Sequence, residues 1–274
     1  MNAREIRKSV RERYAGIAKG GPSCCGPSPA CAGESLAEKV SRQVGYSEKE
    51  TGSVPEGANL GLGCGNPTAL ASIRPGETVL DLGSGAGFDC FLAAKEVGPR
   101  GRVIGVDMTA EMIEKARENA RRGGYENVEF RLGEIENLPV PDASVDLVLS
   151  NCVINLSTNK RRVFEEAFRV LRPGGRLMIS DLVLEKHLPE SIRESVSAYV
   201  GCVAGALPKE EYLEAIRSAG FRDVGIAGES AFPVSCFATD PLVQRVIEEA
   251  SLPPGAIGEL EGSVASIKVY GRKP

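Results

Sequence analysis

Short apolar runs alternate with amphipathic stretches through the middle of the chain. Buried strands are predicted where the runs are richest in Val, Leu and Ile, at 78–82, 102–106, 128–132, 145–150 and 176–181. Apolar residues spaced three or four positions apart predict the helices between them, at 87–96, 110–120 and 160–171. Strands that alternate with helices form parallel sheets with right-handed crossovers. We therefore expect an α/β fold with a doubly wound, Rossmann-like sheet.

The two ends of the chain have a different pattern. Helices are predicted at 4–19 and from about Ser35, and the Gly-, Pro-, Ser- and Cys-rich stretch between them fits neither helix nor strand. Arg-Pro-Gly-Gly at 172–175 predicts a turn that ends the preceding helix. Beyond the core we expect helices at 189–200, 208–219 and 240–250, and strands at 222–228 and 263–271. The chain thus divides into an N-terminal helical, Cys-rich cap (1–70), a core (71–185) and a C-terminal α+β extension that completes the sheet (186–274).

Composition narrows the class of protein. The chain has 274 residues, and its 33 basic and 37 acidic side chains are mixed along the sequence, which gives no case for a nucleic-acid surface. No run approaches the roughly 20 apolar residues of a membrane span, and the charged N-terminus lacks a secretory apolar core. We therefore expect a cytoplasmic protein without a membrane partner. A single histidine, His187, argues against a His-based metal site, and eight cysteines favour ligands, reactive thiols or core filler over disulfides.

A glycine-rich turn follows the first predicted strand. Gly83, Gly85 and Gly87 open a helix, where glycines allow a tight turn and a close approach of backbone N–H groups to a ligand. The alternative, a dinucleotide site, requires its third glycine at position 88, which is Phe. Asp81 would repel a pyrophosphate but suits a ligand with ammonium and sulfonium charges. Asp107 ends the next strand, where an acid can accept from ribose hydroxyls.

Four segments, VLDLGSGAGFD, GVDMT, GEIENLPVPDASVDLVLSN and RVLRPGGRL, together resemble the class I S-adenosylmethionine-dependent methyltransferases over about residues 74–181. The resemblance implies that S-adenosyl-L-methionine is the cofactor. It implies that Asp81 and the Gly83-Ser84-Gly85 backbone hold the methionyl end, that Asp107 binds the ribose, and that Met108, Glu134 and Ile135 surround the adenine. Asn151 is assigned to the same donor site. For Glu134, an exposed turn residue is the alternative.

Three cysteines are candidates for the acceptor site. Cys152 lies two residues beyond the end of a predicted strand, and ligands of open α/β sheets bind beyond such ends. Cys64 lies between glycines, which predicts an accessible thiol on a loop, and Cys202 has small neighbours. For a single cysteine the common alternative is a small buried apolar residue. We expect that role for Cys90 and Cys236.

SNCVINLSTNK, GCVAGAL, GCGNP and CCG resemble the arsenite methyltransferases. The resemblance implies that trivalent arsenic, a thiophilic centre, is bound by Cys64, Cys152 and Cys202. Its lone pair would attack the sulfonium methyl, so that catalysis consists mainly of orientation and needs no strong base. A thiol reductant such as thioredoxin or glutathione would close the cycle. Two alternatives remain: a C-methyltransferase for a quinone-like or other organic molecule, and a non-catalytic metalloid sensor.

The N-terminal cysteines depart from that family pattern. Cys24, Cys25 and Cys31 fall within eight residues, whereas the family has one functional cysteine in this region. Our hypothesis is a thiol–disulfide relay between these residues and Cys64. The alternatives are a zinc-binding loop, although the paired Cys-x-x-Cys of common zinc sites is missing, and surface thiols without a function.

Overall fold

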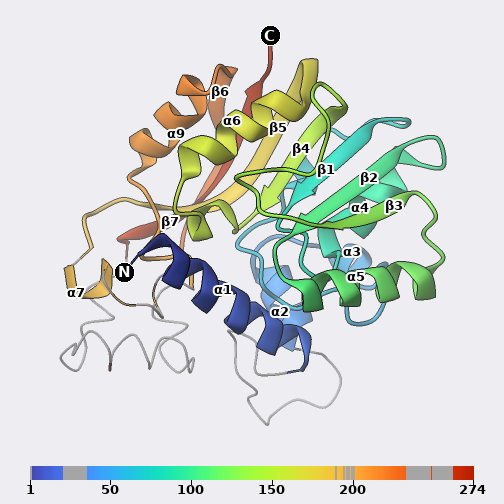
Figure 1. Cartoon of the computed structure of the whole chain (residues 1–274), viewed down its shortest axis with the longest axis horizontal. Coiled ribbons are helices and arrows are strands. Elements are labelled where there is room, and N and C mark those ends of the chain that lie inside the picture. Colours follow the sequence, from blue (N-terminus) through green and yellow to red (C-terminus); the bar gives the residue numbers. More distant parts are fainter. Residues whose placement is uncertain are drawn as a thin grey trace.

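The computed structural model describes residues 2–20, 36–188, 190–193, 195, 198, 201–232, 248 and 262–274. Its centre is a seven-stranded sheet of order β3-β2-β1-β4-β5-β7-β6 (Figure 1). The strands are β1 (Thr78–Leu82), β2 (Arg102–Asp107), β3 (Val128–Leu132), β4 (Val145–Asn151), β5 (Leu171–Leu184), β6 (Arg222–Ala231) and β7 (Val264–Arg272). The first five strands are parallel, which confirms the predicted fold class. The last two are antiparallel to their neighbours and extend the sheet.

Helices cover both faces of the sheet and the ends of its strands. The described helices are α1 (Ala3–Ala18), α2 (Leu36–Gln43), α3 (Glu48–Thr51), α4 (Phe88–Val97), α5 (Ala110–Gly123), α6 (Lys160–Val170), α7 (Glu190–Arg193) and α9 (Lys209–Ser218). Two 3-10 turns, η1 (Thr68–Leu70) and η2 (Ile154–Leu156), lie in loops. No helix among these described segments is both long and apolar enough to cross a membrane.

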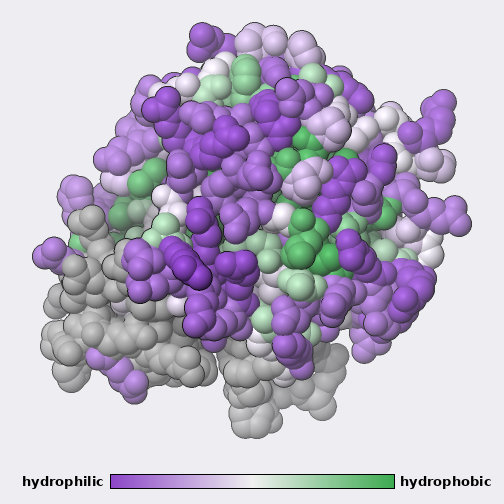
Figure 2. All heavy atoms as spheres, viewed as in Figure 1, coloured by the Kyte–Doolittle hydropathy of each residue, from purple (hydrophilic) through white to green (hydrophobic). Residues whose placement is uncertain are grey.

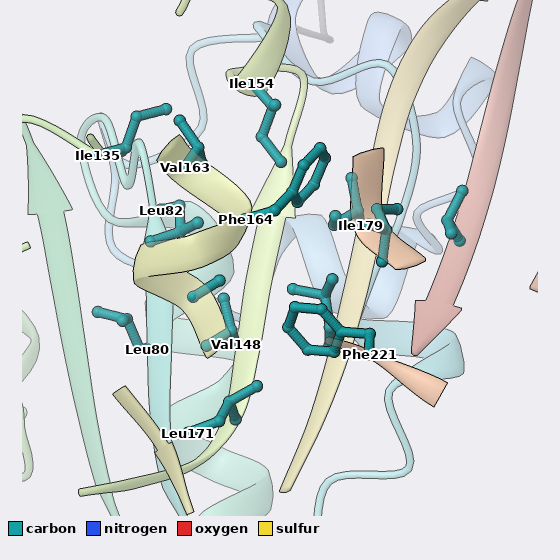
Figure 3. Packing of buried hydrophobic residues seen from close by; sticks show 14 of the residues in the cluster. Leu80, Leu82, Ile135, Val148, Ile154, Val163, Phe164, Leu171, Ile179 and Phe221 are labelled. Atoms are coloured by element: carbon teal, nitrogen blue, oxygen red, sulfur yellow. The ribbon is translucent and has the colours of Figure 1, made fainter. Parts of the chain in front are cut away.

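The hydrophobic core has two halves because successive strand residues point to opposite faces. On one face Leu80, Leu82 and Val148 pack with Phe164 of α6, as Figure 3 shows. Val79 and its neighbours on the other face pack against α4 and α5. Strands that are buried on both faces have continuous apolar runs, which is why these runs were readable in the sequence.

Most predicted elements match, and the differences have local causes. The helix before Arg172 does end there, but residues 172–175 belong to the start of β5 rather than to a turn outside the sheet. The pairing of β4 with β5 shifts register at this point, which accommodates Gly174 at a φ of +79°. The helix predicted at 189–200 is described only in part, as α7, and most of the one at 240–250 lies outside the described residues.

Helix α1 lies across the carboxyl ends of the parallel strands, next to α5 (Figure 1). Arg7 approaches Glu134 and Glu136, at 3.9 and 3.8 Å, and Lys19 pairs with Glu111 at 2.9 Å. The face drawn in Figure 2 is mainly hydrophilic, with apolar residues in small groups. Helix α1 therefore covers the carboxyl ends of the strands, where α/β proteins bind their ligands.

Candidate functional site

The glycine loop is held tightly between β1 and β2. The Gly83 and Ser84 N–H groups donate to the Val106 carbonyl at 2.8 and 3.0 Å, and the Gly85 N–H donates to Asp107 Oδ2 at 3.0 Å. Gly83 has a φ of +68°, and a Cβ there would overlap the Val153 side chain. Glycine is therefore required at this position for both backbone conformation and space.

A cavity with about 1070 Å³ of empty space, part of it open to solvent, lies between the glycine loop, the strand ends and α1. Such a volume can hold a nucleotide-sized ligand. Eight of the nine residues predicted for the donor line it: Asp81, Gly83, Ser84, Gly85, Asp107, Met108, Ile135 and Asn151. The ninth, Glu134, lies at the rim beside Arg7, and the adjacent Glu136 lines the wall instead. The structure thus brings these residues together, and their individual roles stay predictions.

Asp107 is already oriented by the backbone. Its Oδ1 accepts from the Thr109 N–H at 2.8 Å, and its Oδ2 accepts from Gly85. Burial raises the pKa of this carboxyl, and the backbone hydrogen bonds oppose the rise. Each carboxylate oxygen can accept more than one hydrogen bond, so acceptor capacity for a ligand hydroxyl remains.

Asp81, Asp89, Tyr46 and Asn151 form a buried polar cluster at one end of the cavity. The Tyr46 hydroxyl donates to Asp89 Oδ1 at 2.6 Å, and Asn151 Nδ2 donates to Asp89 Oδ2 at 3.1 Å. Burial raises the pKa of Asp89 to about 6, and burial together with the charge of Asp89 raises the pKa of Asp81 well above its usual value. Two adjacent buried acids that form no ion pair with a Lys or Arg of the described residues favour a cationic ligand.

Sequence reasoning missed Tyr46 and Asp89 as members of this cluster. Asp89 is in the quoted glycine-loop segment, two residues beyond Gly87, and its position in the first turn of α4 was the available signal. Tyr46 lies in the N-terminal region, 43 residues from its partner, in a segment without a recognisable motif.

The three predicted cysteines pack together in one cluster beside this cavity. Cys64 and Cys202 belong to one buried cluster, and Cys152 packs against it and lines the cavity. The Cys202 thiol donates to the Cys152 carbonyl at 3.0 Å, and the Cys64 thiol donates to the Ser180 carbonyl at 3.6 Å. Cys152 and Cys202 have φ of +58° and +67°. Non-glycine residues in this conformation are strained, and such strain gathers at functional sites.

The expectation that Cys64 is accessible on a loop is wrong, because its exposed fraction is 5%. The neighbouring glycines allow close packing instead of exposure. A Cβ on Gly63 would stand 2.6 Å from Asn151 Nδ2, and one on Gly65 would overlap the Ser180 hydroxyl. The Cys64 N–H donates to Asn151 Oδ1 at 3.1 Å, so the loop is fixed against β4.

Burial also sets the protonation state of the thiols. Desolvation raises the pKa of Cys64. The hydrogen bond with Cys202 lowers the pKa of Cys152, but the interaction with Cys64 and burial outweigh it, and the pKa lies well above the usual value. These thiols are therefore protonated in the free protein, and a thiophilic centre has to displace their protons.

A carboxylate that the sequence did not point to lies beside the thiols. Ligand atoms of Cys64, Cys152 and Asp181 all lie within 4.8 Å of one another. Asp181 is in the carboxyl-terminal half of β5, next to β4, and is fully buried. The remaining predicted cysteines, Cys24, Cys25, Cys31 and Cys236, lie outside the described residues, while Cys90 is buried as expected and donates to Asp81 at 3.2 Å.

The fold and the cavity define the class of protein. A family model described as "Methyltransferase domain" matches residues 73–220, more than half of the chain, so the chain belongs to this methyltransferase family and has the class I methyltransferase fold. A solved arsenic(III) S-adenosylmethionine methyltransferase from Chlamydomonas reinhardtii is 32% identical with a TM-score of 0.62, over 88% of this chain and 74% of that one. An arsenite methyltransferase of Halobacterium salinarum is 54% identical over 230 residues, which make up 81% of this chain and 59% of that protein. The chain belongs to the arsenite methyltransferase family.

The similarity covers only part of each protein compared. The chain spans 59% and 50% of the length of two curated arsenite methyltransferases that it matches. A ubiquinone/menaquinone biosynthesis C-methyltransferase from Hydrogenovibrio crunogenus is 40% identical, but over only 111 residues, or 40% of this chain. The quinone enzyme therefore matches a far smaller part of the chain than the Halobacterium protein does.

Proposed function

We propose that this protein methylates trivalent arsenic with S-adenosyl-L-methionine as the donor. The observation that carries the proposal is the convergence of Cys64, Cys152 and Cys202, which come from segments far apart in the chain, beside the cavity of the glycine loop. Soft thiolate ligands suit a thiophilic centre. Organic acceptors would not require three adjacent thiols.

The cavity residues fit the donor in its chemistry. The buried acids Asp81 and Asp89 would face the ammonium group, and Asp107 would accept from the ribose hydroxyls. Met108 and Ile135, which line the cavity, would form an apolar wall beside the adenine. Cys152 lines the same cavity, so an acceptor bound to it would be close to the donated methyl group.

The proposed reaction begins with exchange of arsenic-bound hydroxide for thiolate. Each thiol proton leaves with a hydroxide as water, so that the exchange needs no external base. Three sulfurs then form a trigonal pyramid around arsenic, and its lone pair attacks the methyl carbon in line with the leaving sulfur. Holding the two reactants at a near-attack distance of roughly 3–3.5 Å is the main contribution of the protein.

Because the arsenic lone pair forms the new bond, the proposed step leaves arsenic formally pentavalent, and two electrons are needed to return it to the trivalent state. We propose that a thiol reductant such as thioredoxin or glutathione supplies the electrons. Cys24, Cys25 and Cys31 are the proposed relay to Cys64.

The test is incubation of the purified protein with arsenite, S-adenosylmethionine and glutathione, followed by separation of the methylated arsenic species. Cys152→Ser and Cys202→Ser are expected to lower arsenite affinity at least 10-fold and to leave S-adenosylmethionine affinity within about 3-fold, because one soft ligand is lost while the glycine loop is unchanged. Cys90→Ala is the matched control for loss of a buried thiol outside the cluster, and it should bind arsenite normally. Donor turnover that is the same with and without arsenite would contradict the proposal.

The partial likeness to the quinone enzyme supports a second candidate, C-methylation of an organic acceptor. That function predicts that methyl transfer survives replacement of all three thiols. A variant with serine at Cys64, Cys152 and Cys202, assayed with a quinol, distinguishes the two.

A further inference from the structure

Asp181 is a buried carboxylate whose hydrogen bonds suit its ionised form. Its Oδ1 accepts from Asn155 Nδ2 and from the Leu182 N–H, both at 2.9 Å. Its Oδ2 accepts from the Tyr212 hydroxyl at 3.0 Å. All three groups donate, as an ionised carboxylate requires. The side chain has an exposed fraction of 0%, and no ion pair joins it to a described Lys or Arg.

A buried negative charge without an ion-pair partner is costly, and it persists where it has a use. The cation that interacts electrostatically with Asp181 is Lys160 of α6. Burial lowers the pKa of Lys160, and the negative charge of Asp181 opposes this shift. Lys160 Nζ itself donates to the carbonyls of Ser157 and Asn155, at 3.1 and 3.5 Å. The Lys160 ammonium is thus bound to backbone oxygens and leaves the Asp181 charge without a direct contact.

Asp181 lies beside two of the thiols and outside the lining of the donor cavity. Its carboxylate is within 4.8 Å of the Cys64 and Cys152 sulfurs. Cys152 lines the cavity, whereas Asp181 does not belong to the described lining. An arsenic atom bound to these sulfurs would therefore lie close to the Asp181 carboxylate.

The proposed methyl transfer moves a positive charge across this arrangement. The bond between the methyl carbon and the sulfonium sulfur breaks, and its electron pair stays on sulfur, which becomes a neutral thioether. The arsenic lone pair forms the new arsenic–carbon bond. Arsenic with three thiolates is neutral before the step and carries a formal charge of +1 after it. Fixed groups of opposite sign that face a developing charge lower the barrier.

We propose that the Asp181 carboxylate stabilises the positive charge that arsenic acquires during methyl transfer. The inference rests on the proposed arsenite methylation and adds a charge-stabilising residue to it. Tyr212 and Asn155 hold the carboxylate in place. Because the negative charge of Asp181 is in place before the reaction, the surrounding groups do not have to reorganise when the methyl group moves.

Asp181→Asn tests the proposal because it removes the charge and keeps the shape. The rate of a single turnover, measured by rapid quench with protein preloaded with arsenite, is expected to fall about 10- to 100-fold. Arsenite affinity is expected to stay within about 3-fold, since the thiols are unchanged. Asp181→Glu, which restores the charge on a longer side chain, should recover part of the rate. Asp146→Asn is the matched control and should have a normal rate. The Asp146 carboxylate binds Arg172 and lies at the start of β4, away from the end of the strand that reaches the cavity.

Three results would overturn the proposal. The first is an Asp181→Asn rate within about 3-fold of the wild-type rate. The second is a loss of arsenite affinity in Asp181→Asn as large as its loss of rate, because that result indicates a structural role. If the asparagine variant does not fold, Asp181→Ser with the same two measurements takes its place. Wild-type protein that forms no methylated arsenic overturns both this inference and the proposed function, whereas wild-type activity with an unaffected Asp181→Asn overturns this inference alone.

Discussion

Gly65→Ala is the sharpest test of how the Cys64 loop is positioned. A Cβ at this residue would overlap the Ser180 hydroxyl and stand 3.0 Å from Ser180 Cβ. Gly65 does not have a positive φ, so the substitution adds volume without backbone strain. The loop or β5 has to move until the atoms reach ordinary contact, at 3.4 Å or more. Forcing extra volume into a packed site costs about 1–3 kcal/mol.

The cost should appear mainly in arsenite binding. The Cys64 loop is held by single hydrogen bonds, such as that from the Cys64 N–H to Asn151, whereas β5 is paired along its length with β4 and β7. The loop is therefore easier to displace than β5. A loss of about 1–3 kcal/mol from the arsenic-competent state corresponds to roughly a 5- to 150-fold weaker affinity. Titration with arsenite, followed by the ultraviolet absorbance of arsenic–thiolate bonds, measures it. A melting curve gives the accompanying loss of stability.

Ser180 provides the compensating change. Its hydroxyl is buried without a hydrogen-bond partner among the described residues, so removing it costs little. Gly65→Ala combined with Ser180→Gly removes the overlapping atoms and is expected to recover most of the arsenite affinity. Normal affinity in Gly65→Ala alone, or a double variant as weak as the single one, would refute the packing argument.

Two further predictions concern stability. The pKa of Asp89 is raised to about 6 in the fold, above its usual 3.8, so its contribution to stability is complete below about pH 3.8 and is lost as the pH rises through 6. Asp89→Asn should therefore become more stable relative to wild type between pH 4 and 7, measured by urea unfolding without donor, and a constant difference would contradict the assignment. Glu166 is buried and accepts hydrogen bonds from the Leu138 N–H, Arg162 and Arg169. Glu166→Gln should lower the unfolding free energy by about 2–3 kcal/mol. This loss is smaller than is usual for a fully buried ion pair, because Arg162 and Arg169 are partly exposed. A measured loss under about 1 kcal/mol would contradict this prediction.

The sequence predicted the fold and the cavity because both depend on local patterns. Apolar runs locate the five parallel strands, and their ends locate Asp81, Asp107 and Cys152 without any coordinates. Parallel strands end at a common edge, so residues at those ends are neighbours wherever they lie in the chain. The same rule placed Cys152 beside the donor cavity.

The features that the sequence did not predict depend on contacts between distant segments. The burial of Cys64 follows from packing on Asn151, 87 residues away, and on Ser180, 116 residues away. Asp181 reads as an ordinary strand residue in the sequence, and its importance appears only when Asn155, Tyr212 and the thiols surround it. The glycines next to Cys64 predict an accessible loop, whereas in the folded chain their missing side chains allow the loop to pack closely against Asn151 and Ser180.

Asn151 joins the two halves of the site. Its Oδ1 accepts from the Cys64 N–H, and its Nδ2 donates to Asp89, to the Tyr46 hydroxyl at 2.8 Å and to the Gly65 carbonyl at 2.9 Å. One amide group therefore contacts the acids assigned to the donor and the backbone of the thiol loop. A side chain held by so many partners has one orientation, and a shift on either side changes hydrogen bonds on the other. For this reason donor affinity belongs among the measurements on Gly65→Ala: a loss there as well as in arsenite affinity means that the loop shift reaches Asp89 through Asn151, and a loss in arsenite affinity alone means that it stops at the loop.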